Sequence, residues 1–243
     1  MATTEAERRS FEDRLIAGRD SVPGVPRPGD YVVVDVTHFS TTVAELLGRG
    51  AEYVHITDER GDEFAFRDDH PEALIGGGKT DAYEPTEGYD FFNSPSYVAD
   101  IDVAGRPTSM TSKNGGTAVA RLRRRGGEGV EVFVGGYANA AALAEFLDGR
   151  DRPVWIVSCG SSGEATMDDH LGAVLVDRYL RGEPLSEAER EHFEELLVTS
   201  KPGYDEKPDR RQRDLHEFAT AINSRAVVPR LDGDRLVDAA SDA

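Results

Sequence analysis

Short apolar runs recur along this chain, and stretches with apolar positions at helical spacing follow them. The four residues Tyr31-Val32-Val33-Val34 show no alternation of apolar and polar positions, which is typical of a strand buried on both faces of a parallel sheet. A polar loop then opens a stretch, 43–47, that has helical spacing and stops at two glycines. The pattern predicts a strand–turn–helix unit.

The same unit appears at least three times. A β-branched strand ends in a loop of small residues that begins a helix at 34–42, at 134–139 and at 157–169. Recurrence of this kind predicts a parallel-sheet protein, because each crossover helix packs back onto the sheet. We therefore expect a three-layer α/β/α fold with a mostly parallel sheet.

The remaining pattern predicts a single domain over 1–243. A helix over 4–18 and a proline-rich lead-in occupy 1–29, the α/β core covers 30–231, and 239–243 form a frayed tail. Further strands are predicted at 53–56, 130–134, 154–157 and 226–229, helices at 118–125, 140–147, 184–198 and 215–222, and irregular polar segments at 58–70 and 201–213.

The net charge and the cysteine count of the chain exclude several classes of partner and site. The chain carries 46 acidic and 28 basic residues, a formal net charge of −18, which argues against nucleic acid and anionic membranes as partners. Acid spread along the whole chain, with lysine scarce beside arginine, is typical of halophilic proteins. The single cysteine excludes an intramolecular disulfide framework and a cysteine-based zinc cluster. Without an apolar run of membrane length or a signal-peptide core, we expect a cytoplasmic protein.

The first candidate site follows the strand at 31–34. Asp35 ends the strand, and Ser40, Thr41 and Thr42 lie where the next helix begins. Ligands of open α/β sheets collect at the carboxyl ends of strands, and helix N-termini attract anions. The competing interpretation is purely structural, since serine and threonine are common N-caps and an aspartate often only satisfies loop amides.

A second candidate loop precedes the helix predicted at 118–125. It is dense in hydroxyl groups and contains one lysine and two adjacent glycines, so it offers amide and side-chain donors to a small anion. An ordinary Asn-Gly turn is the alternative, although a helix follows it rather than a second strand. The candidate residues are Ser112, Lys113, Asn114, Gly115 and Thr117.

Other polar residues carry weaker signals. The glycine run before Lys79 lacks the P-loop spacing, so it indicates a glycine turn with one useful cation. Pro95 biases Ser94 toward an extended conformation, and Asn93 and Ser94 could project from a rigid corner. Asn139 is a plausible helix cap beside two glycines.

Taken together and in order, these loops resemble the 2-phosphosulfolactate phosphatase (ComB-like) family. The resemblance covers about 30–231, nearly the whole chain. His38 stands where the family usually has an arginine, and Gly116 is an insertion. The matching pieces are Asp35-Val36-Thr37-His38-Phe39-Ser40-Thr41-Thr42, Asp90-Phe91-Phe92-Asn93-Ser94-Pro95, Thr111-Ser112-Lys113-Asn114-Gly115-Gly116-Thr117, Gly135-Gly136-Tyr137-Ala138-Asn139-Ala140, Ser158-Cys159-Gly160 with Asp168-Asp169, and Val227-Val228-Pro229.

This resemblance implies Mg²⁺-dependent hydrolysis of a small acidic phosphate monoester, the step that gives sulfolactate and phosphate in coenzyme M biosynthesis. It implies that Asp35 and Asp169 are metal ligands or water-positioning bases. The implied phosphate- and substrate-binding residues are Ser40, Thr41, Thr42, Lys79, Asn93, Ser94, Ser112, Lys113, Asn114, Gly115, Thr117, Asn139, Cys159 and Gly160. A homodimer is one option for the assembly.

Two residues keep competing interpretations. Cys159 could be a phosphate-accepting nucleophile, but the Cys-x5-Arg loop is absent, and a buried inert thiol is the favoured alternative. His38 could be a general acid or a neutral replacement for the arginine. The main functional alternative is a catalytically silent member of the family that binds an anionic metabolite or nucleotide; a phosphatase for another acid phosphate and an interaction scaffold follow.

Overall fold

The computed structural model describes residues 10–242, and among them ten strands form one mixed sheet. The strand order is β1-β8-β2-β7-β9-β10-β3-β6-β4-β5, and six of the nine neighbouring pairs are parallel. The hairpin β9-β10 joins two parallel blocks. The strands are β1 Leu15–Ala17, β2 Gly29–Val34, β3 Tyr53–Ile56, β4 Leu74–Gly77, β5 Phe91–Phe92, β6 Pro107–Met110, β7 Val130–Val134, β8 Val154–Ser158, β9 Pro229–Asp232 and β10 Arg235–Asp238.

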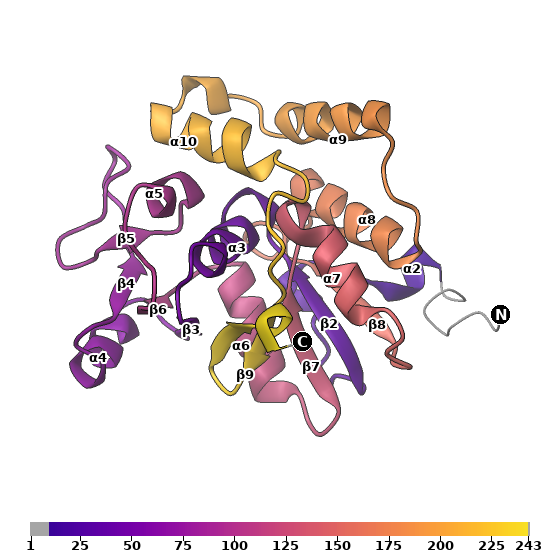
Figure 1. Cartoon of the computed structure of the whole chain (residues 1–243), viewed down its shortest axis with the longest axis horizontal. Coiled ribbons are helices and arrows are strands. Elements are labelled where there is room, and N and C mark those ends of the chain that lie inside the picture. Colours follow the sequence, from indigo (N-terminus) through magenta and orange to yellow (C-terminus); the bar gives the residue numbers. More distant parts are fainter. Residues whose placement is uncertain (1–9, 243) are drawn as a thin grey trace.

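Helices cover both faces of this sheet (Figure 1), which confirms the expected α/β class with a mostly parallel sheet. Helices α9 and α10 lie along the top in Figure 1, over α8 and α5 respectively. The helices are α2 Phe11–Arg14, α3 Thr41–Gly48, α4 Asp62–Asp69, α5 Pro95–Ala99, α6 Gly115–Arg125, α7 Ala140–Leu147, α8 Met167–Leu180, α9 Glu187–Thr199 and α10 Asp209–Arg213. No helix in the described part of the chain is long and apolar enough to cross a membrane.

Strand β2 shows why its sequence lacks alternation. All six of its residues are buried. Tyr31 and Val33 belong to one core cluster with apolar residues of α3 and α6, whereas Val32 and Val34 belong to a second cluster with α7 and α8. The strand therefore has helices on both faces, as the apolar run predicts.

The N-terminal helix prediction is wrong at its C-terminal end. Positions 4–9 lie outside the described residues, α2 ends at Arg14, and Leu15–Ala17 form strand β1, which pairs in parallel with β8. Leu15 packs against one core cluster and Ile16 against the other. Two adjacent apolar residues that face opposite sides suit an edge strand, whereas a helix would turn both toward one side.

Other differences involve elements with weak local signals. Residues 58–70 and 201–213, expected to be irregular, contain α4 and α10, and strand β6 at 107–110 was not expected. The strand predicted at 226–229 begins at Pro229, where it forms the hairpin with β10. A six-residue π-helical segment, Asp214–Ala219, replaces most of the helix expected over 215–222. Residues 239–242 form a 3₁₀ turn.

Candidate active site

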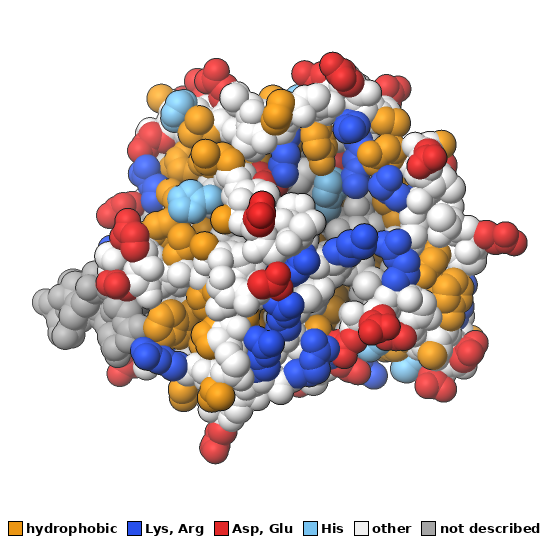
Figure 2. Space-filling model, turned by 180° about the vertical axis from the view of Figure 1, so that it is seen from behind, with side chains coloured by type: hydrophobic (Ala, Val, Ile, Leu, Met, Phe, Trp, Pro, Cys, Tyr) orange, Lys and Arg blue, Asp and Glu red, His pale blue; other side chains and the backbone are white. Residues whose placement is uncertain are grey.

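A pocket of about 180 Å³ lies where the carboxyl ends of both parallel blocks meet. Its walls come from the carboxyl ends of β4 and β5, from the segments that follow β2, β3, β4, β5 and β6, and from α10. Residues nearly 180 positions apart in the chain therefore share it. Seen from behind, lysine and arginine side chains gather toward the middle of the molecule, and most acidic side chains lie toward its outline (Figure 2). The pocket is lined by Asp35, His38, Arg60, Gly77, Lys79, Phe92, Asn93, Thr111, Ser112, Lys113, Asn114 and Arg211.

Asp35 supplies the carboxylate of this pocket. It directly follows β2 and precedes a π-helical turn, Val36–Ser40, in which the Ser40 amide donates to the Asp35 carbonyl oxygen at 2.9 Å. The Gly115 amide at the start of α6 donates to Asp35 Oδ2 at 2.8 Å. Burial raises the pKa of Asp35 to about 6, and the Gly115 hydrogen bond offsets part of that effect. The carboxylate is thus tied to the second candidate loop.

Asp169 lies behind Asp35 and holds two loops together. Its Oδ1 accepts the Val36 amide and its Oδ2 accepts the Gly160 amide, each at 2.8 Å. Burial, followed by the charges of Asp35 and Asp168, raises the pKa of this carboxyl well above its ordinary value. Asp169 therefore joins the turn after β2 to the loop after β8.

The neighbouring Asp168 was not among the predicted site residues, although it belongs to the same Asp-Asp pair. Its Oδ2 accepts a hydrogen bond from Thr37 Oγ1 at 2.6 Å and forms an ion pair with Lys201. Burial raises the pKa of Asp168, but the Lys201 charge and hydrogen bonds from Lys201, Thr37 and Thr166 outweigh that effect and hold the pKa below its ordinary value. An ionised Asp168 therefore sits beside the more protonated Asp169.

Four cations line the pocket: Arg60, Lys79, Lys113 and Arg211. Lys79 and Lys113 were expected from the sequence, whereas Arg60 and Arg211 were missed because they lie in segments predicted to be irregular. The ring of Tyr83 contacts two of the four, with Lys79 Nζ at 3.9 Å and the Arg211 guanidinium at 4.9 Å from its centroid. Cation–π contacts of this kind lower the cost of holding two like charges close together.

His38 lines the same pocket in its neutral form. Burial lowers its pKa well below the ordinary value, and the charges of Arg211, Lys201 and Lys79 lower it further. The imidazole stacks on Tyr204, with 6.4 Å between ring centroids, and its Nε2 lies 3.4 Å from the Tyr204 hydroxyl oxygen. A neutral ring supports the interpretation of His38 as a neutral replacement for the arginine. A general acid would need to be protonated at neutral pH.

Asn93 and Asn114 give the pocket its amide groups. The Oδ1 atom of Asn93 is buried and has no hydrogen-bond partner. Asn114 Oδ1, in contrast, accepts a hydrogen bond from Arg19. An orphaned buried acceptor costs free energy, so a donor on a ligand or an ordered water is expected at Asn93.

Ten predicted site residues do not line the pocket. Most of them serve contacts within the protein, and Thr42 is fully buried with its Oγ1 unpaired. Thr41 Oγ1 donates to the Val36 carbonyl oxygen at 2.6 Å, Ser94 caps α5, and Thr117 Oγ1 donates to the Ser112 carbonyl oxygen. Cys159 is fully buried, and burial raises the pKa of its thiol well above the ordinary value. The ten are Ser40, Thr41, Thr42, Ser94, Gly115, Thr117, Asn139, Cys159, Gly160 and Asp169.

The carboxylates do not form a ready-made metal cage. Within residues 10–242, no group of three or more histidine, cysteine, aspartate or glutamate side chains is arranged to hold a metal ion. Mg²⁺ needs less than that, because it is often bound by one or two carboxylates together with waters and phosphate oxygens. Asp35 faces the pocket and fits such a role, whereas both oxygens of Asp169 already accept amides.

Comparison with known proteins identifies the family of the chain. The family model described as 2-phosphosulpholactate phosphatase matches residues 20–229. A probable 2-phosphosulfolactate phosphatase of Thermus thermophilus is 31% identical over 188 residues, 76% of each chain. Proteins of the same description are 31% identical over 66% of this chain in Deinococcus radiodurans and 26% identical over 85% in Thermoplasma acidophilum. The aligned segment spans 65% of the Deinococcus protein and 87% of the Thermoplasma protein. The chain belongs to the 2-phosphosulfolactate phosphatase family.

Proposed function

We propose that the protein is a phosphoric monoester hydrolase that converts a small acidic phosphate ester, 2-phosphosulfolactate or a close analogue, to the hydroxy acid and inorganic phosphate. One observation carries the proposal. A protein with a formal net charge of −18 places four cations around a pocket of about 180 Å³ that contains one carboxylate. The pocket is positively charged although the whole molecule is negatively charged, so a small polyanion is attracted to the pocket and repelled elsewhere.

The chain's own residues account for binding and orientation. Arg60, Lys79, Lys113 and Arg211 neutralise the phosphate and the other acidic groups of the substrate, and the small volume excludes larger esters. Asn93 Oδ1 accepts a hydrogen bond from water or from the hydroxyl group of the product. Phosphoryl transfer depends mainly on positioning and charge stabilisation, and the pocket is built for both.

Asp35 acts at the reacting phosphate as a proton acceptor or as a metal ligand. With a pKa of about 6 it is mostly ionised at neutral pH, so it can accept a proton from an attacking water or bind a hard cation. We include Mg²⁺ in the proposal, with Asp35 as the direct ligand and Asp169 behind it. When bound, the ion supplies positive charge to the phosphoryl oxygens.

The test is phosphate release from a panel of small acid phosphates that includes 2-phosphosulfolactate, measured in concentrated KCl with Mg²⁺ and with EDTA. Asp35→Asn is measured alongside, and Asp151→Asn is the matched control because Asp151 is exposed and far in sequence from every pocket residue. We expect Mg²⁺-dependent release that Asp35→Asn abolishes and Asp151→Asn retains. Release that survives Asp35→Asn would refute the role given to this carboxylate.

A catalytically silent anion-binding protein is the second candidate, favoured by the neutral His38 at a position where an arginine is usual in the family. The two candidates share the cationic pocket and differ only in turnover. Binding of inorganic phosphate by folded protein, without release from any ester in the panel, would select the binding protein.

A further inference from the structure

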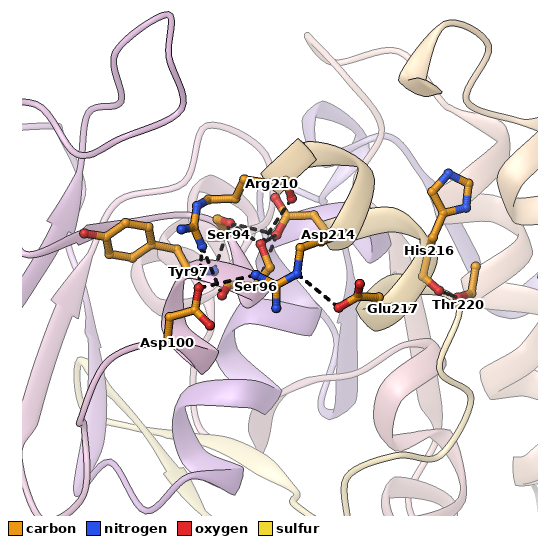
Figure 3. A network of polar contacts seen from close by, with 10 residues as sticks. Ser94, Ser96, Tyr97, Asp100, Arg210, Asp214, His216, Glu217 and Thr220 are labelled. Atoms are coloured by element: carbon orange, nitrogen blue, oxygen red, sulfur yellow. Dashed lines mark hydrogen bonds and ion pairs between the residues drawn. The ribbon is translucent and has the colours of Figure 1, made fainter. Parts of the chain in front are cut away.

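A buried polar network joins the α5 N-terminus to the segment that begins at α10 (Figure 3). At its centre lies Asp214, which is 0% exposed. Ser94 and Ser96 reach it from α5, at the Asn-Ser-Pro corner that the sequence singled out. Within this corner, Ser94 serves an internal contact, whereas Asn93 lines the pocket.

The two carboxylate oxygens of Asp214 have different partners. Oδ1 accepts hydrogen bonds from Ser94 Oγ at 2.7 Å, from the Ser96 amide at 3.0 Å and from Ser96 Oγ at 2.6 Å. Oδ2 accepts one from Arg211 Nη1 at 3.2 Å. One oxygen therefore anchors the corner beside Asn93, and the other holds a cation of the pocket.

Of the three arginines of α10, Arg211 is held by a different acid from the other two. Arg210 and Arg213 both pair with Asp100 on the surface, at 2.9 and 3.3 Å, and Arg210 stacks on Tyr97. Arg211 alone lines the pocket, between the Tyr83 ring and Asp214. Arginine side chains have many rotamers, and fixing one over a binding pocket needs contacts of this sort.

We propose that Asp214 is a positioning residue for the anion pocket, which sets the Arg211 guanidinium toward the bound anion through Oδ2 while Oδ1 holds the corner that presents Asn93. For catalysis the proposal rests on the proposed phosphatase function. For anion binding it stands on the geometry alone, because Arg211 lines the pocket whether or not turnover occurs.

The substitution Asp214→Asn separates the two contacts. An asparagine Oδ1 can still accept the serine hydrogen bonds, but its amide nitrogen would face Arg211, donor against donor. The matched control is Asp100→Asn, which removes an acid that ties the same short helix to α5 without touching Arg211. If Asp214 only stabilised the fold, both variants would change stability and neither would change anion affinity.

The experiment titrates inorganic phosphate into the full-length protein by calorimetry and measures KM, kcat and Tm for the wild type, Asp214→Asn, Asp100→Asn, Arg211→Ala and the double variant Asp214→Asn/Arg211→Ala. We expect Asp214→Asn to weaken phosphate binding and to raise KM by about tenfold, the range of a charge-assisted hydrogen bond. The change in kcat should be smaller, and Asp100→Asn should match the wild type in affinity. In the Arg211→Ala background, Asp214→Asn should have no further effect on affinity.

Unchanged phosphate affinity in folded Asp214→Asn would overturn the proposal, and so would a loss that is additive with Arg211→Ala. If Asp214→Asn does not fold, Arg211→Lys tests the same point, because lysine keeps the charge and cannot keep the guanidinium geometry. Wild-type affinity in Arg211→Lys would then overturn the proposal. Because phosphate binding needs no turnover, a protein that releases no phosphate refutes the proposed function and leaves this test intact.

Discussion

Asp35→Asn should increase stability while it abolishes activity. Burial raises the pKa of the Asp35 carboxyl from 3.8 to about 6, so the folded protein is less stable with this group ionised. Asparagine has no charge, and its Oδ1 can still accept the Gly115 amide that now bonds to Asp35 Oδ2 at 2.8 Å. The substitution therefore removes the cost of the charge and keeps the hydrogen bond.

The size of the effect follows from the pKa. A rise from 3.8 to about 6 corresponds to about 3 kcal/mol above pH 6, at about 1.4 kcal/mol for each tenfold change in proton affinity. For a chain of this size that is roughly 6–12 °C in Tm. Because a carboxyl with a raised folded-state pKa costs nothing while protonated in both states, the difference should vanish below about pH 4 and grow between about pH 4 and 6.

Thermal unfolding of the wild type, Asp35→Asn and the exposed control Asp151→Asn, followed from pH 4 to pH 8 in EDTA, measures this directly. Both variants change the net charge equally, so a gain in Asp35→Asn alone reports burial, with Asp151→Asn expected within about 0.5 kcal/mol of the wild type. Two results would refute the reasoning: no gain for Asp35→Asn at pH 7.5, or a gain that persists unchanged at pH 4.

Three further predictions concern neighbouring positions. Cys159→Ala should retain phosphate release within about twofold, because the raised pKa of the thiol makes it a poor nucleophile, and should lose about 1–2 kcal/mol of stability, because the thiol is buried. Loss of release with an intact fold would make Cys159 a nucleophile. His38→Arg introduced into the Arg211→Ala variant should recover part of the phosphate affinity that Arg211→Ala loses, since both residues line one pocket. A phosphate titration that shows no recovery would mean that the two side chains contact different parts of the anion. Gly115→Ala should lower the free energy of unfolding by about 1–3 kcal/mol, because an added Cβ would clash with the fully buried Phe39 ring; denaturant unfolding at wild-type stability would contradict the packing.

Sequence reasoning succeeded where the signal is local. The unbroken apolar run 31–34 predicted a strand buried on both faces, and helix α7 has the bounds that its alanine-rich pattern predicted. Asp35 lines the pocket because it directly follows a central parallel strand, and pockets of open α/β sheets form at the carboxyl ends of such strands. Lys79 and Lys113 were found for a similar reason, since each lies in a glycine-containing loop.

Sequence reasoning failed where a side chain's direction decided the outcome. Thr41 and Ser94 stand at helix starts and could serve either a ligand or the backbone; the tertiary structure turns both inward. Strand β1 has only three residues and exists because β8 offers it a pairing edge. The contact of Ser94 with Asp214 and the pairing of β1 with β8 depend on neighbours that are distant in sequence, which no local pattern contains.

The layered α/β architecture, the acidic composition and the position of Asp35 at a strand end can be read from short segments of the chain, since hydrophobic periodicity and strand-end chemistry are local properties. The cations that share the pocket with this carboxylate, in contrast, are set by long-range packing. Arg60 and Arg211 reach it from segments with no periodic signal, and Arg211 lies 176 positions after Asp35. Their convergence depends on where the carboxyl ends of the two parallel blocks meet, and that is set by the packing of the whole sheet.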